Sequence, residues 1–323
     1  MKLLSGDAYY KALLHAMPRA QERIVVAAMN ILWGEKIDAI FDELDKATSR
    51  GVRVHILVDN YARLARAFPR IPKAECRLRI KKTFVLLHEL EKKGATVTYF
   101  GKIGLNPYKG RCHVKLTVID DNAYSFGGFN MTDEAFDNLD YIFHCHNKDV
   151  ADCLEQLVQR IRVGGSPLPN GEVPLGASNT AILFDGGRRK DSLIFNKACE
   201  LTSQAIRVFF ISQWVPSGRL ASLISPIDAC YFNRTEQMPA PDSWGAAFDQ
   251  HRYHIRNYYT GSTYIHAKCM LFELPGGKKA VLTGSHNFSY RGVAFGTQEI
   301  ALYSEDKKLW NELHTFIQRQ LAS

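Results

Sequence analysis

The sequence lacks the apolar stretches of a membrane-spanning or secreted protein. None of its apolar runs reaches the roughly 18 residues that a membrane-spanning helix needs. The N-terminal segment, residues 1–7, turns polar before the apolar core of a signal peptide could form. These absences predict a cytoplasmic protein that is at most peripheral to a membrane.

Cysteine pairs and dense metal-binding motifs are also missing. The seven cysteines are an odd number and form no C-x-x-C pair, which argues against a disulfide framework and against a structural zinc site. No H-E-x-x-H helix and no cluster of carboxylates indicates another metal site. We therefore expect reduced, buried thiols and no metal or other cofactor.

The chain does have a clear excess of positive charge. Its 323 residues are 46% hydrophobic and 23% charged, as in a soluble protein of one large domain or two smaller ones. The formal net charge of +8 favours a polyanionic partner, which can be nucleic acid, an anionic lipid surface or a phosphate-bearing substrate. Residues 63–82 contain eight basic residues and one acid, and this segment fits a binding surface and a plain solvated face equally well.

The first half of the chain alternates strands and helices. Residues 23–30 and 52–59 have the apolar pattern of buried strands, and residues 36–49 between them have helical spacing. A strand–helix–strand unit of this kind predicts a right-handed parallel crossover and hence an α/β fold. The pattern continues with a helix at 81–93, strands at 96–100, 113–119, 124–127 and 141–145, and a helix from 148 to about 162.

The second half repeats much of this order after a segment rich in glycine and proline. Residues 164–178 are the predicted linker between an N-terminal domain, 1–163, and a C-terminal domain, 179–323. The predicted elements are strands at 205–214, 227–232, 266–272, 280–284 and 298–303 and helices at 217–224 and 306–321. The least regular stretches, 60–80 and 233–262, are candidates for substrate loops or for plain connections.

One short pattern occurs twice, about half a chain apart. Each copy has a histidine, a lysine two residues later, then an acid, and finally an asparagine behind a Gly-Gly or Gly-Ser pair. The first copy is His113, Lys115, Asp120 and Asn130, and the second is His266, Lys268, Glu273 and Asn287.

The repeated pattern points to phosphate chemistry. On a strand, residues i and i+2 share a face, so each histidine would lie beside its lysine on an otherwise apolar strand. A polar pair in such surroundings is costly unless it binds something. Lysine, asparagine and backbone N–H groups around a histidine would cradle a phosphodiester and its transition state without a metal.

These residues resemble the HxK(x)4D motif of the phospholipase D superfamily, present twice as in its monomeric members. Residues 127–134 also resemble the sequence that follows the first motif of bacterial cardiolipin synthases. The resemblance implies two pseudo-symmetric α-β-α lobes, with mixed sheets packed side by side and the active site at the lobe interface. It further implies phosphodiester transfer or hydrolysis on glycerophospholipids through a covalent phosphohistidine, with no cofactor.

The resemblance also implies roles for individual residues. It favours His113 as the nucleophile and His266 as the acid/base, although a pseudo-symmetric site leaves the reverse open. Lys115, Lys268, Asn130 and Asn287 would hold the phosphoryl oxygens.

Two further acids would orient the histidines, as the acid on the strand after the asparagine does in the family. The candidates are Asp140 and Glu299, each counted from the histidine of its own half, with Asp137 as an alternative to Asp140. Asp120 and Glu273 would brace turns, and Glu273 departs from the aspartate usual in the family.

Two other functions compete with a lipid enzyme. A phosphodiesterase acting on DNA or RNA would use the same basic surface to follow phosphates. A catalytically inactive binding module would keep the fold, but the intact histidine and lysine of both motifs argue against it. Because both motifs lie in one chain, a monomer is sufficient, and the sequence leaves the oligomeric state open.

Overall fold

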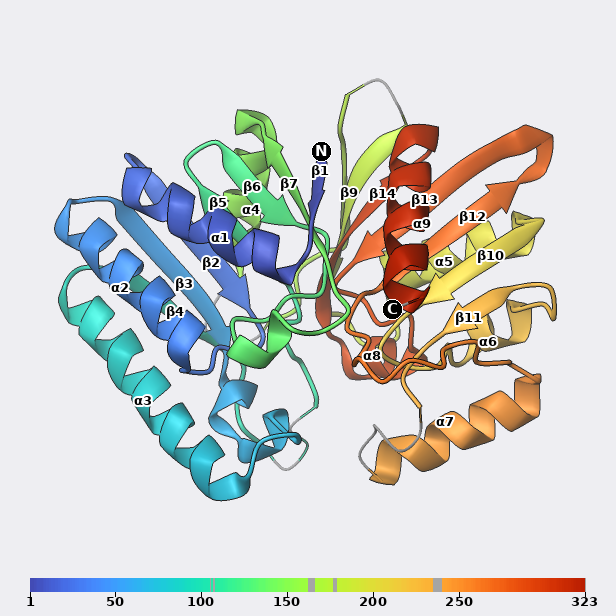
Figure 1. Cartoon of the computed structure of the whole chain (residues 1–323), viewed down its shortest axis with the longest axis horizontal. Helices are drawn as coiled ribbons and strands as arrows, with labels where there is room; N and C mark the ends of the chain where they lie inside the picture. Colours follow the sequence, from blue (N-terminus) through green and yellow to red (C-terminus); the bar gives the residue numbers. More distant parts are fainter. Residues whose placement is uncertain (105, 107, 162–165, 177–178, 235–239, 323) are drawn as a thin grey trace. The chain divides into compact units, whose positions relative to one another are not determined.

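The computed structural model describes all residues except 105, 107, 162–165, 177–178, 235–239 and 323. The described residues form two compact units, each built on a seven-stranded mixed sheet (Figure 1). The first unit contains residues 1–125, 129–137 and 141–168, and the second contains residues 126–128, 138–140 and 169–323. This is the mixed α/β fold class that the sequence predicts.

In the first unit, three parallel strands adjoin a set of antiparallel ones. The order across the sheet is β1 (Lys2–Leu4), β7 (Ile142–His146), β6 (Asn122–Ser125), β5 (Leu116–Ile119), β2 (Arg23–Ala28), β3 (Arg53–Asp59) and β4 (Thr96–Phe100). β2, β3 and β4 run parallel, and the other neighbours pair antiparallel. The predicted parallel crossover is confirmed, with helix α2 (Glu35–Ser49) joining β2 to β3.

Three helices share one core with the central strands of this sheet. They are α1 (Gly6–Ala16), α2 and α3 (Lys73–Lys92), which lie together on the left of Figure 1. In α2 the side chains of Ile37, Ile40 and Leu44 are buried at helical spacing, so one stripe of the helix meets the sheet. Helix α4 (Lys148–Arg160) contacts β5 and β6 and contributes nothing to that core.

The sheet of the second unit repeats the central part of this topology and differs at its edges. Its order is β11 (Ala229–Tyr231), β10 (Arg207–Ile211), β12 (Cys269–Leu274), β13 (Lys278–Gly284), β14 (Gln298–Ser304), β9 (Thr180–Gly186) and β8 (Gly171–Pro174). β10 is joined to the parallel strand β11 through α6 (Arg219–Leu223), as β2 is joined to β3 through α2. β12, β13 and β14 follow one another antiparallel, as β5, β6 and β7 do, so the internal duplication is present in the strand order.

Helices again cover the second sheet. Helix α5 (Leu193–Gln204) shares a core with the central strands, and α9 (Lys307–Ala322) contacts β13, in front of which it lies in Figure 1. The remaining helices are α7 (Ala240–Tyr253) and α8 (Tyr290–Phe295).

Two of the stretches predicted to be irregular contain helices. α3 begins at Lys73, two turns before the predicted start, because its buried face includes Arg79 and Thr83 and so lacks a plain apolar period. Arg79 is buried through an ion pair with Glu134 at 2.6 Å. The stretch 233–262 contains α7, and its residues 235–239 lie outside the described residues.

The predicted linker also contains regular structure. Residues 171–174 form the edge strand β8, which pairs antiparallel with β9. Residues 164, 165, 177 and 178 of the linker lie outside the described residues. No described helix combines the length and the apolar composition needed to cross a bilayer. All seven cysteines are free thiols, each of them buried or half-buried.

Candidate active site

Each His-x-Lys segment lies directly before a β-hairpin. His113 and Lys115 precede β5, and His266 and Lys268 precede β12, so the regular strands begin three residues later than predicted. The Lys115 ammonium donates to the carbonyl of His113 at 2.9 Å, and the Lys268 ammonium donates to the carbonyl of His266. All four side chains are buried. The motif therefore repeats in its hydrogen bonding as well as in its sequence.

A buried carboxylate holds the histidine of the second motif. His266 Nδ1 lies 2.9 Å from Asp140 Oδ2, and the other oxygen, Oδ1, accepts the N–H of Gly128 at 3.0 Å. The backbone N–H groups of His266 and Ala267 both donate to the carbonyl of Leu139 at 2.9 Å. With Nδ1 donating to the carboxylate, the lone pair of the neutral ring is on Nε2, the nitrogen suited to take up or deliver a proton.

This pairing crosses the two halves of the sequence. The number of residues between His113 and Asp140 predicted that Asp140 would orient His113. In the structure Asp140 contacts His266 instead, and residues 138–140 belong to the second unit. Leu139 forms a parallel bridge with Ile265 and so places Asp140 beside the second motif. The alternative acid, Asp137, is exposed and pairs with Lys36 at 2.9 Å.

Gly128 is required here for a steric reason. A Cβ on this residue would lie 2.3 Å from the carbonyl oxygen of His266 and 2.5 Å from Asp140 Oδ2. In the structure Gly128 brings its backbone close to the carboxylate that holds the histidine.

Lys268 and Glu299 add charge to this site. Complete burial lowers the pKa of Lys268 to about 8, although the nearby carboxylates of Asp140 and Glu299 act in the opposite direction. Glu299 lies on β14 and accepts the hydroxyl of Ser285 at 2.5 Å. The second unit therefore places a histidine, a lysine and two carboxylates in one buried polar cluster.

The two motif asparagines differ in their surroundings. Asn130 Oδ1 accepts the N–H of Asn30 at 3.3 Å. Asn287 Oδ1 is buried and has no hydrogen-bond partner among the described residues. An unsatisfied buried amide oxygen is costly, so this position suits the hydroxyl of a ligand or of water.

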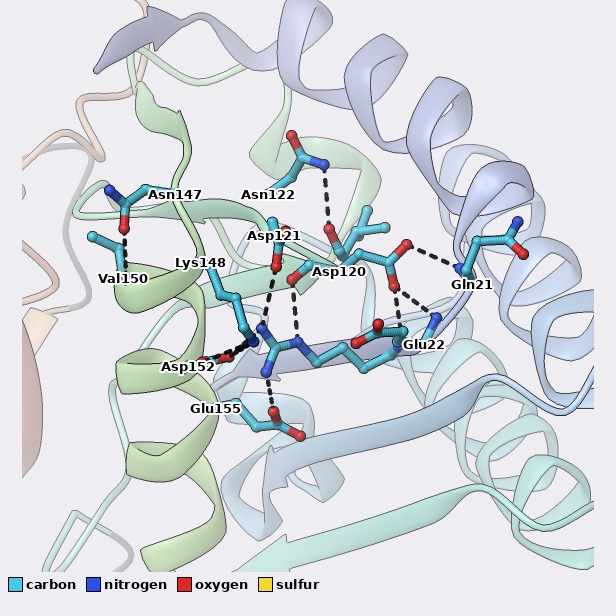
Figure 2. Close-up of polar contacts among 12 residues, drawn as sticks. Gln21, Glu22, Asp120, Asp121, Asn122, Asn147, Lys148, Val150, Asp152 and Glu155 are labelled. Carbon is cyan, nitrogen blue, oxygen red and sulfur yellow. Dashed lines mark hydrogen bonds and ion pairs between the residues drawn. The ribbon is translucent and has the colours of Figure 1, made fainter.

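The first motif acid, Asp120, has a structural role. Its carboxylate accepts the backbone N–H groups of Gln21, Glu22 and Arg23 at 2.9 to 3.0 Å (Figure 2). Partial burial would raise the pKa of Asp120, but these three donors outweigh it and lower the pKa below its usual value. The second motif acid, Glu273, lies opposite Lys279 in the β12–β13 hairpin.

A further carboxylate, which the sequence reasoning missed, fixes the chain just before His113. Asp59, at the end of β3, pairs with Arg111 at 2.8 Å and accepts the N–H groups of Cys112 and Tyr61 at 2.7 Å. Burial raises the pKa of Asp59 to about 6 even though Arg111 and the two amides favour the charged form. The available signal was an acid at the end of a predicted strand together with an arginine two residues before the motif.

Metal-binding clusters do not occur in the part of the chain that the structure describes. No three histidine, cysteine, aspartate or glutamate side chains there are grouped so as to hold a metal ion.

Known proteins match part of the chain in sequence. Residues 13–162 match the family model described as "Cardiolipin synthase, PLD-like domain". Cardiolipin synthase B from Salmonella typhimurium (strain LT2) is 28% identical over 179 residues, which are 51% of this chain and 38% of that protein. Cardiolipin synthase B from Salmonella typhi matches to the same extent. The alignment thus spans well under two thirds of these relatives.

Solved structures resemble the whole chain. Phosphatidylserine synthase from Haemophilus influenzae Rd KW20 has a TM-score of 0.73 at 13% identity, over 99% of this chain and 85% of that one. Polyphosphate kinase from Porphyromonas gingivalis has a TM-score of 0.62 at 14% identity, over 99% of this chain and 50% of that one. At such identities the likeness shows the fold alone.

Proposed function

We propose that the chain is an enzyme of the phospholipase D superfamily and that it transfers or hydrolyses phosphatidyl groups of glycerophospholipids. The matching family model and the two curated relatives both name cardiolipin synthases, and the model describes the matched domain as PLD-like. The observation that carries the proposal is the buried cluster of His266, Asp140 and Lys268, which has the parts of an acid/base and a phosphate-binding cation.

The proposed reaction has two steps. In the first, His113 attacks phosphorus, a P–N bond forms, and the P–O bond to the leaving alcohol breaks. The leaving oxygen takes the proton of the His266 imidazolium. In the second, neutral His266 takes the proton of an incoming alcohol or water, whose oxygen attacks phosphorus as the P–N bond breaks. Both histidines then have their starting protonation states.

The remaining motif residues would stabilise the transition state. Lys115 and Lys268 are buried cations that would offset the charge on the phosphoryl oxygens, and such charges act strongly where water is excluded. Asn130 and Asn287 would donate hydrogen bonds to the same oxygens. The assignment of His113 as nucleophile comes from the family resemblance, while the carboxylate on His266 supports an acid/base role for that ring.

The substrate class can be tested directly. Purified protein incubated with phosphatidylglycerol vesicles is expected to form cardiolipin and glycerol, or phosphatidic acid when water is the acceptor. Thin-layer chromatography and mass spectrometry of the extracted lipids measure both products. Cleavage of single- or double-stranded nucleic acid without any turnover of lipid would overturn the proposal and favour a phosphodiesterase of nucleic acids.

Lys268 predicts the alkaline side of the pH profile. In the proposed role Lys268 binds phosphate only as the cation, and its pKa is lowered from 10.5 to about 8. The fraction of enzyme molecules with a protonated Lys268 therefore declines as the pH rises through 8. We expect kcat/KM to fall by about tenfold per pH unit above this pKa.

Variants at this position make the assignment specific. Lys268→Met should lack activity at every pH, and Lys268→Arg should keep its charge and lose the alkaline decline. The effect of Lys268 on stability runs in the opposite direction to its effect on activity. Because the folded state releases the Lys268 proton at a lower pH than the unfolded state does, the free energy of unfolding rises between about pH 8 and 10.5. An unchanged alkaline limb in Lys268→Arg would assign that limb to another group.

A further inference from the structure

Helix α7 presents large aromatic side chains to solvent. Trp244 is 79% exposed and Phe248 is 60% exposed, and Trp244 has the largest exposed fraction of any large apolar side chain in the described residues. The two residues are four apart, so they stand one above the other on the same face of the helix. Exposed aromatic pairs of this kind mark interaction sites.

The opposite face of α7 attaches the helix to the second unit. Ala246 is buried in the core of that unit, and the half-buried Tyr253 packs against the same core. The outward arc from residue 243 onward contains Trp244, Ala247, Phe248 and His251, all exposed and none acidic. The acid Asp249 is half-buried and lies off this arc. In Figure 1, α7 lies at the lower edge of the second unit, next to α6.

Arginines flank the aromatic ridge. The guanidinium carbon of Arg252 lies 5.9 Å from the centre of the Phe248 ring. The Arg291 guanidinium lies against the helix at Gly245, where Nη2 would be 3.6 Å from an added Cβ. Both arginines are exposed. Exposed aromatic rings beside guanidinium groups match the boundary between the acyl chains and the phosphates of a bilayer.

We propose that α7 docks the protein on an anionic phospholipid bilayer, with Trp244 and Phe248 in the interface and Arg252 and Arg291 at the lipid phosphates. This inference rests on the proposed function, in which the substrate is a bilayer lipid, and it names the surface through which the enzyme meets that substrate. Apolar area and electrostatic attraction together set the strength of such binding.

Pairing of α7 with α7 of a second copy fits the structure less well. A two-fold interface brings the same patch of both subunits together and must therefore be self-complementary. Here the flank has two arginines and one half-buried acid, Asp249, which interacts with both, and the outward arc has no acid, so a two-fold contact would bring more like charges than opposite charges together. Two aromatic side chains are also far fewer than the roughly 20–30 residues a side of a stable protein interface.

The test measures vesicle binding by the double variant Trp244→Ser/Phe248→Ser. With vesicles of equal parts phosphatidylcholine and phosphatidylglycerol, we expect binding at least tenfold weaker than that of the unmodified protein. The matched control, Ile206→Ala/Ile227→Ala, removes side chains of the same unit that are 58% and 63% exposed, and it should bind within twofold of the unmodified protein. Brominated lipids should quench Trp fluorescence in the unmodified protein and much less in Trp244→Phe.

Activity on a short-chain phosphatidylglycerol dispersed as monomers separates docking from catalysis. The double variant should retain this activity while its activity on vesicles falls. Undiminished vesicle binding, equal loss of activity on monomers, or a dimer that becomes monomeric in the double variant with binding unchanged would each overturn the docking role. Vesicle binding that depends on α7, in a protein that turns over no lipid, would instead leave docking intact and reject the proposed function.

Discussion

The variant His113→Ala is expected to form no covalent adduct with substrate and to lose at least about 10⁴-fold in kcat/KM. Without this imidazole no P–N bond can form. Water would have to attack the substrate directly, without the covalent intermediate that divides the reaction into two easier steps. The adduct is measured by quenching the reaction with a phosphorus-labelled substrate in alkaline detergent, because P–N bonds of histidine survive alkali and break in acid.

The companion variant His266→Ala separates the two steps. A phosphodiester with a good leaving group, such as a nitrophenolate, needs no general acid, so labelling of His266→Ala should persist while its breakdown becomes slow. With a natural lipid, whose leaving alkoxide needs a proton, the same variant should label poorly. The exposed His88, on α3 of the first unit, provides the control His88→Ala, with labelling and turnover unchanged. Adduct found only in the His113 variant would reverse the two roles.

The sequence was most informative where a pattern has a single physical meaning. The parallel crossover from β2 to β3 and the duplicated strand order followed from apolar periodicity and glycine positions. Helix α3 was predicted too short because its buried face includes Arg79, which looks solvent-exposed until its partner Glu134, far away in the sequence, is known. Helix α7 was missed for a related reason, since its largest apolar side chains face solvent.

The contacts at the candidate site also depend on partners that the sequence does not reveal. The motif residues could be named from the sequence because they recur, but the partner of His266 could not. Asp140 precedes the predicted linker, and only the folded chain shows that residues 138–140 join the second unit. The clamp of Asp59 on Arg111 was likewise invisible, because it joins residues 52 positions apart.

Asp140→Asn is expected to lower kcat/KM by about 10² to 10⁴-fold while leaving the fold intact, as the corresponding change does in a Ser-His-Asp triad. The hydrogen bonds around residue 140 determine how the asparagine amide is oriented. Gly128 N–H donates to one oxygen of the carboxylate, so the amide oxygen of the asparagine must take that place. The amide NH₂ then faces His266 Nδ1 and turns this nitrogen into an acceptor, which places the ring proton on Nε2. The neutral ring in that tautomer cannot accept the proton of an incoming alcohol.

Two measurements separate this tautomer effect from a general loss of structure. Nitrogen NMR of the imidazole should show the proton moving from Nδ1 to Nε2, with the melting temperature little changed. The alkaline limb of kcat/KM should also shift to lower pH, because the Asp140 charge that supports protonated Lys268 is gone. The matched variant Asp137→Asn removes an exposed carboxylate that pairs with Lys36 and should behave like the unmodified protein. Full activity in Asp140→Asn together with a loss in Asp137→Asn would show that the orienting acid is Asp137, and the cluster around His266 would then have no acid/base role.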